Sequence, residues 1–301
     1  MDTNSLILLG VALLPAIVLS IYIFKKDSAE KEPIGLLAKL AIGGVIICFP
    51  AGEIESVVID AVNQVFGSFA VVENGQAYLP EGMYNLYVLT ENTIGVALIE
   101  EGLKFLVMWL LTRNNKNFNY LFDGIVYAVF VSLGFAGFEN VLYAFNHGMS
   151  TALLRMITAV PAHTFFAILM GYYYSQWHVY EVAKQKEIRL IAQHVLSSRN
   201  ERLSGKKYLV LALTVPTLIH GFYDYCCSIS EVWATLVFIG LMIFLYIYCF
   251  MKVRKMSQYD IQDVTAADAI LIRKYPSLVQ YYEELRIRKM NEEYNHETSF
   301  Y

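Results

Sequence analysis

The sequence predicts an all-α membrane protein, a polytopic bundle of about seven transmembrane helices. Hydrophobic residues make up 56% of the 301-residue chain and charged residues only 17%, against about 25% in soluble globular domains. The charged residues are also unevenly placed, because they gather at 25–32, 112–116, 181–207 and 252–298. Every second loop between the apolar stretches is basic, which is typical of a chain that crosses a bilayer repeatedly.

Seven apolar stretches have the length of a membrane span, for which about 20 residues are needed. They lie at about 5–24, 34–50, 87–111, 120–145, 152–176, 208–228 and 233–251. The first is not interpreted as a signal peptide, because its N-terminal residues are acidic and its apolar run is too long. We therefore divide the chain into two N-terminal spans with an outer helix (1–86), a central group of spans (87–228), a last span (229–251) and a cytoplasmic tail (252–301).

The basic residues of the loops predict the orientation. Loops 25–33, 112–119 and 177–207 carry three, two and seven Lys and Arg residues, whereas loops 51–86 and 146–151 carry none. Because Lys and Arg favour the cytoplasmic side, we expect the N-terminus outside and the C-terminus inside. The net charge of −4 gives no indication of nucleic-acid binding.

Two segments outside the spans have helical patterns. Between residues 53 and 69 the apolar side chains fall on one stripe, which predicts an amphipathic helix on the outer membrane surface. A helix packed on the bundle, or a lid over a site, would have the same pattern. The polar segment 260–301 predicts a short helical appendage.

Small residues recur every four positions in the fourth span, at Gly124, Ala128, Ser132 and Ala136. Helices in lipid pack closely through such residues. We therefore expect this helix to be central.

Seven ionisable residues lie inside the apolar stretches, where each charge at the bilayer centre costs roughly 2.5–3.5 kcal/mol. They are Glu100, Glu101, Lys104, Glu139, His163, His220 and Asp224. The depth of each residue follows from counting about 1.5 Å per residue from the predicted outer end of its span. On this estimate, the acidic residues of two spans and the histidines of two others lie at similar depth, between the outer surface and the midplane. We expect the seven to meet in one cavity and to activate water or bind a metal.

The spacing adds detail to this expectation. Glu100 and Lys104 are four residues apart, in the favourable order for an ion pair, whereas Glu101 is rotated by about 100° and is free to point elsewhere. Asp224, four residues after His220, is placed to hold that imidazole in one tautomer.

The motifs in this region occur in a familiar order. They are Glu100-Glu101-Gly-Leu-Lys104, then Phe138-Glu139-Asn140-Val-Leu-Tyr143, then an RxxxxxPxH at Arg155, Pro161 and His163, and finally His220-Gly-Phe-Tyr-Asp224. This order and spacing, over about 87–228, resembles the PrsW family of intramembrane proteases, relatives of the CAAX-protease and bacteriocin-processing group.

The resemblance implies a membrane-embedded peptidase that cuts single-span, membrane-anchored proteins such as anti-sigma factors near the extracytoplasmic side. It implies a bacterial-type cytoplasmic membrane and a part in envelope-stress signalling. The residues carried over as catalytic are Glu100, Glu101, Glu139, His163, His220 and Asp224, with Lys104, Asn140 and Arg155 in support.

Amide hydrolysis needs an activated water, a stabiliser for the oxyanion and an acid for the leaving amine. We assign the general base to Glu101, because Lys104 engages Glu100. His163 and His220 either donate to the oxyanion or bind a metal such as zinc together with Glu139, since two His and one Glu form a catalytic zinc set. The chain has no HExxH motif, and analogy with the relatives favours the metal-free mechanism slightly.

Two other functions would use the same residue types. A seven-span, metal-dependent lipid amidase also places His and Asp in the membrane, and would release fatty acid rather than peptides. A proton-coupled transporter would use the acids and histidines as a relay, although such transporters often contain internal repeats and none is visible here.

Overall fold

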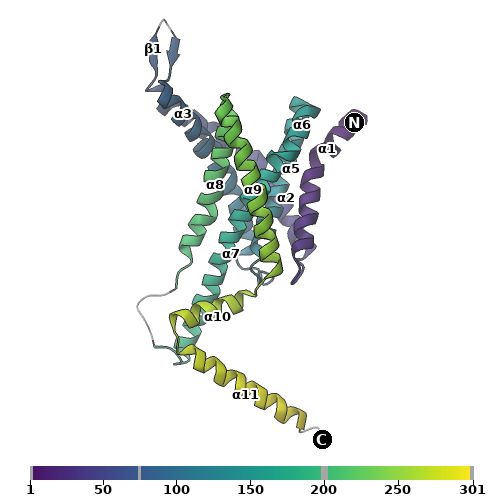
Figure 1. The fold of residues 1–301 in the computed structure, drawn as a ribbon, viewed down its shortest axis with the longest axis vertical. Helices are drawn as coiled ribbons and strands as arrows, with labels where there is room; N and C mark the ends of the chain where they lie inside the picture. The colour runs from purple at the N-terminus through teal and green to yellow at the C-terminus, as the bar shows by residue number, and fades with distance from the viewer. Residues whose placement is uncertain (1–2, 74–75, 198–202, 299–301) are drawn as a thin grey trace.

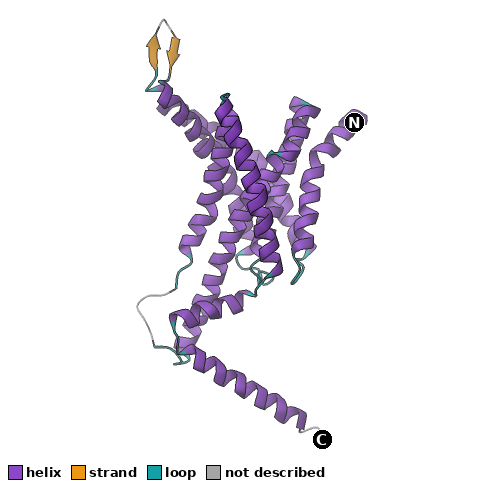
Figure 2. Ribbon diagram, viewed as in Figure 1, coloured by secondary structure: helices purple, strands orange, loops and turns teal. Residues whose placement is uncertain are grey.

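The computed structural model describes residues 3–73, 76–197 and 203–298, and it confirms an all-α bundle (Figure 2). The helices are α1 (Thr3–Lys26), α2 (Ile34–Gly67), α3 (Glu81–Thr90), the π-helix η1 (Glu91–Ala97), α4 (Leu98–Thr112), α5 (Asp123–His147), α6 (Met149–Ile157), α7 (Ala159–Ala192), α8 (Lys206–Ser228), α9 (Val232–Gln258), α10 (Asp263–Lys274) and α11 (Leu278–Thr298). One antiparallel hairpin joins β1 (Val71–Glu73) to β2 (Gln76–Tyr78). Residues 198–202, in the predicted basic loop, and 299–301, at the end of the tail, lie outside the described residues.

Six helical stretches of the described chain are long and apolar enough to cross a membrane: α1, α2, α5, α6 with α7, α8 and α9. The predicted third span, 87–111, is helical throughout but is divided among α3, η1 and α4. None of these three reaches the length of a span alone, because the π-helical turn interrupts the α-helical hydrogen-bond pattern.

Helices α5 and α7 form the centre of the bundle (Figure 1). In the apolar 18-residue window of each helix, 67% of α5 is buried, whereas 22% of α1 and 22% of α9 are buried. The four small residues of the fourth span are almost wholly inside: Ala128, Ser132 and Ala136 are at most 1% exposed, and a Cβ at Gly124 would overlap Ser175 and the backbone of α7. The expectation of a central helix is therefore met, with close backbone approach as its physical basis.

The predicted fifth span, 152–176, is broken. Helix α6 ends at Ile157 and α7 begins at Ala159. Pro161 has no N–H and its ring would clash with the carbonyl group four residues earlier, at Ile157, so an uninterrupted helix is disfavoured there. Before α6, Gly148 at φ +85° turns the chain back from α5.

The amphipathic segment 53–69 is not a separate helix. Helix α2 continues through Pro50 to Gly67, and its 34 residues span roughly 51 Å, well beyond the hydrocarbon thickness of about 30 Å. Helix α7 likewise extends to Ala192 through residues predicted as loop.

The first part of the tail, through α10, is docked on the bundle, whereas α11 extends away from it (Figure 1). The Leu121 N–H donates to the Ile261 carbonyl at 3.1 Å, and the Asp263 N–H donates to the Asn119 carbonyl at 2.9 Å. Side chains of α10 pack with the end of α7 in a second apolar cluster that includes Val179, Ala183, Ala267 and Leu271. The two chain ends lie at opposite ends of the molecule (Figure 1).

Candidate active site

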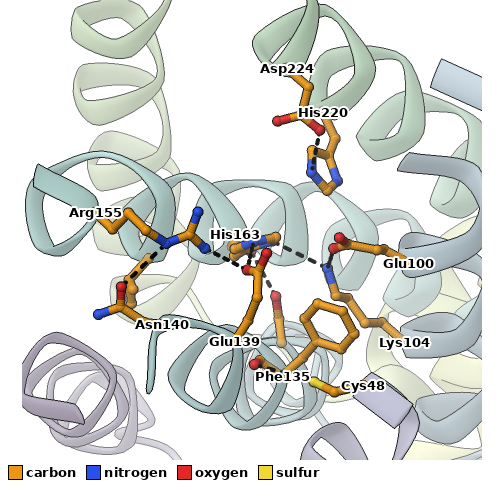
Figure 3. Close-up of polar contacts among 12 residues, drawn as sticks. Cys48, Glu100, Lys104, Phe135, Glu139, Asn140, Arg155, His163, His220 and Asp224 are labelled. Carbon is orange, nitrogen blue, oxygen red and sulfur yellow. Dashed lines mark hydrogen bonds and ion pairs between the residues drawn. The ribbon is translucent and has the colours of Figure 1, made fainter. Parts of the chain in front are cut away.

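The buried ionisable residues predicted from the sequence come together in the middle of the bundle. Helix α4 supplies Glu100, Glu101 and Lys104; α5 supplies Glu139; α7 supplies His163; and α8 supplies His220 and Asp224. Glu100, Glu101, Lys104, His163 and His220 are all at most 5% exposed. Figure 3 shows most of these side chains pointing toward one another.

Lys104 lies between the two adjacent glutamates. Its Nζ is 2.8 Å from Glu100 Oε2 and 2.9 Å from Glu101 Oε1. The prediction that Glu101 is free of this lysine is wrong, since residues three and four apart both lie within reach of a long side chain on a helix. Within the described part of the chain, the second carboxylate oxygen of Glu101, Oε2, is buried and has no hydrogen-bond partner.

His163 is held between an inner and an outer partner. Its Nδ1 is 3.2 Å from Lys104 Nζ, and its Nε2 is 3.1 Å from Glu139 Oε2. An ammonium group can only donate, so Nδ1 is the unprotonated nitrogen and Nε2–H donates to Glu139.

His220 has a similar arrangement. Its Nδ1 lies 3.1 Å from Glu101 Oε1, and its Nε2 lies 3.2 Å from Asp224 Oδ2. The imidazoles of His163 and His220 are 5.1 Å apart between centroids. His163 thus turns Nδ1 toward Lys104 and His220 turns Nδ1 toward Glu101. Each turns Nε2 toward an outer carboxylate, Glu139 or Asp224 (Figure 3).

The predicted supporting residues Arg155 and Asn140 fix Glu139 from outside. Arg155 Nη2 donates to Glu139 Oε2 at 2.7 Å, and its Nε donates to Asn140 Oδ1 at 3.3 Å. Asn140 in turn donates to the Ala12 carbonyl at 2.8 Å, which ties the site to α1.

Four residues near the group were not singled out from the sequence. Phe135 lies under the Lys104 ammonium, 4.2 Å from ring centroid to Nζ, and Phe166 stacks on His220 at 4.7 Å. Gly221 has no room for a Cβ, which would overlap Thr93 of η1. This close approach brings the π-helix and the glutamates that follow it against α8. Nothing in the sequence distinguishes these two aromatic residues from ordinary residues of an apolar core. Gly221 could have been noticed, because it directly follows His220 in the sequence.

The inner atoms form a group with the geometry of a metal site. Glu100, Glu101, His163 and His220 each offer one ligand atom, and these atoms lie within 4.8 Å of one another. Ligand atoms at 2.0–2.2 Å from one zinc ion cannot be further apart than about 4.4 Å. An ion bound here would draw these atoms slightly closer and displace the Lys104 ammonium group from between them. Glu139, expected to share a metal with the two histidines, is absent from this group because it lies behind His163.

Comparison with known proteins agrees with this geometry. The family model described as PrsW family intramembrane metalloprotease matches residues 32–251, which is most of the chain and contains every residue of the group. The chain belongs to this family.

Curated relatives support the assignment over most of the chain. Protease PrsW of Bacillus subtilis (strain 168) is 27% identical over 257 residues, covering 85% of this chain and 99% of that protein. Protease PrsW of Clostridioides difficile (strain 630) is 30% identical over 239 residues, covering 78% of this chain and 85% of that protein. No solved structure matches the chain.

The protein is therefore an intramembrane protease, and the family description favours a metal-dependent enzyme over the metal-free mechanism preferred from the sequence. Neither the lipid amidase nor the transporter is favoured by the family.

Proposed function

We propose that the protein cleaves single-span, membrane-anchored proteins within the bacterial cytoplasmic membrane, and that the buried group of glutamates and histidines is its catalytic centre. The observation that carries this proposal is the convergence of four protein donor atoms from α4, α7 and α8 inside an apolar bundle. Anti-sigma-factor-like proteins, whose cleavage would signal envelope stress, are the proposed substrates, and the site is expected in the outer half of the bilayer.

The residues present fit a bound metal, with zinc as the proposed ion. His163, His220 and Glu100 would hold it, a set of two histidines and one carboxylate that leaves a position open. Such an ion supplies Lewis-acid polarisation and lowers the pKa of water. The outer carboxylates support this assignment, because ligating histidines almost always donate their other N–H to a carboxylate, carbonyl or water.

Glu101 is the proposed general base. Its Oε2 is buried and has no hydrogen-bond partner among the described residues, while Oε1 accepts from Lys104. One oxygen is therefore anchored and the other is available to take a proton from water and pass it to the leaving amine. Lys104 balances part of the charge of the two glutamates.

The first test compares peptide release from reconstituted single-span membrane proteins by the wild type and by Glu101→Gln. A general base contributes about 10²–10⁴-fold to the rate, so we expect at least a hundredfold loss. Glu53→Gln is the matched control, because Glu53 is exposed on α2 and the change in charge is the same. Near-wild-type turnover by a folded Glu101→Gln would reject the assignment.

Metal content provides a second measurement that does not depend on activity. We expect about one metal ion per chain in the purified wild type and a loss of that ion in His163→Ala. Equal metal content in both proteins would exclude the proposed ligand set while leaving the proteolytic function intact.

A further inference from the structure

A second group of acidic side chains lies far from the catalytic residues. Asp27 and Glu32 are in the turn between α1 and α2, Asp123 is the first residue of α5, and Asp260 lies between α9 and α10. One carboxylate oxygen from each of the three aspartates lies within 4.8 Å of the others. Along α5, Asp123 is roughly 24 Å from Glu139.

Each aspartate of this acidic cluster uses one oxygen to hold the backbone. Asp27 Oδ2 accepts from the Glu32 N–H at 3.1 Å, and Asp260 Oδ1 accepts from the Phe122 N–H at 3.0 Å. Asp123 Oδ2 accepts from two N–H groups, those of Asn119 at 2.9 Å and Tyr120 at 2.7 Å. The carboxylates are thus fixed in position by the loops that carry them.

The other oxygen of each aspartate is buried and unpaired. Asp27 Oδ1, Asp123 Oδ1 and Asp260 Oδ2 have no hydrogen-bond partner among the described residues, and neither has Glu32 Oε2. Asp27, Glu32 and Asp123 are 0%, 4% and 1% exposed. Buried carboxylates in proteins are paired, coordinate a metal or lose their charge by protonation, so three adjacent aspartates that each keep a buried, unpaired oxygen are a candidate cation site.

No side chain of the described residues provides that partner. Across the ranges 3–73, 76–197 and 203–298, no Lys, Arg or His nitrogen lies within 4.0 Å of a carboxylate oxygen of these four residues. Lys31, in the same turn, donates instead to backbone carbonyls, including that of Phe24 at 2.6 Å.

We propose that Asp27, Asp123 and Asp260 bind one hard divalent cation, Mg²⁺ or Ca²⁺. The donor set consists of carboxylate oxygens alone, which suits these ions and not the softer ones. Oxygens that bind one Ca²⁺ at 2.3–2.6 Å lie at most about 5 Å apart, which is the spacing observed. The cation joins the α1–α2 turn, the start of α5 and the link to the tail, all at one end of the bundle (Figure 1).

The test measures the thermal unfolding of the full-length protein in detergent, after chelation, with CaCl₂ or MgCl₂ added. A ligand present at a hundred times its Kd raises the Tm of a protein of this size by about 5 °C. We expect that rise in the wild type and its loss in Asp260→Asn, whose remaining oxygen still accepts from Phe122. The control is Asp268→Asn, because Asp268 pairs with Lys186 and Tyr282 outside the cluster.

The sign of the change without cation separates this site from a folding defect. In chelator, Asp260→Asn is expected to unfold at the same or a higher temperature than the wild type, because one of several repelling carboxylates is gone. Asp27→Asn provides the same comparison if Asp260→Asn does not fold. An equal rise in wild type and both cluster variants, or no rise in the wild type with either ion, would overturn the proposal. All variants keep the catalytic residues, so an ion bound there shifts each protein alike.

Discussion

At the residue scale, the two histidines of the proposed catalytic group are held by carboxylates that do not themselves belong to the inner donor set. Glu139 lies behind His163 and Asp224 behind His220, at 3.1 and 3.2 Å. Both carboxylates are partly exposed, 19% and 23%, whereas Glu101 is wholly buried. Under the proposed function, Glu139 and Asp224 would position the imidazoles, while Glu100 and Glu101 would face the reacting groups.

This division predicts the effect of Asp224→Asn. Removing a carboxylate behind a ligating histidine lowers metal affinity or activity by about 10–100-fold, less than we expect for Glu101→Gln, and kcat should fall with KM unchanged. Steady-state kinetics and metal titration measure the two quantities. Asp60→Asn, at an exposed position of α2, is the control for charge. A variant that kept both wild-type metal affinity and wild-type kcat would show that Asp224 does not orient His220.

At the element scale, close contact between central helices holds the site together. Gly171 of α7 has no room for a side chain, since a Cβ there would overlap the backbone of Gly124 and Ile125 on α5. These two helices also carry His163 and Glu139. Their separation therefore sets the distance across the outer half of the site.

We predict that Gly171→Ala destabilises the protein by about 1–3 kcal/mol, the usual cost of overpacking a tight interior. Gly240→Ala on α9 is the matched control, because open space surrounds that glycine and the substitution should stabilise by up to about 1 kcal/mol. Unfolding in detergent compares the two. Equal stability of both variants would mean that α5 and α7 separate without cost.

At the scale of the whole molecule, the hairpin β1–β2 and the tail helices lie at opposite ends of the bundle (Figure 1). The loops predict that the hairpin is outside and the tail inside, because the basic residues belong to the tail side. The proposed cation site lies on the tail side, and the two proposed metal sites are then reached from different compartments.

Single cysteines in a variant without native cysteines test this orientation. Ala77→Cys, in the exposed hairpin, should react with a membrane-impermeant maleimide in intact cells, and Ser277→Cys, exposed in the tail, should react only after lysis. The reverse pattern would invert the predicted topology, and labelling of both before lysis would contradict an odd number of spans.

The sequence by itself determined the membrane bundle and the set of ionisable residues, because both follow from the hydrophobicity and charge of individual residues in a bilayer. Apolar runs of span length are local properties, and so is the penalty for each charge inside them. The pairs Glu100–Lys104 and His220–Asp224 were also predictable, since helix geometry alone brings residues four apart together.

Tertiary structure alone decided that Glu139 lies behind His163, and where helices break. The removal of Glu139 from the inner donor set follows from the packing of α5 against α7, which no spacing within one helix encodes. The acidic cluster joins Asp27 to Asp260 across more than two hundred residues, and each looks like an ordinary loop carboxylate in the sequence. Only packing reveals that these aspartates are buried side by side, and that burial is the basis for the proposed cation site.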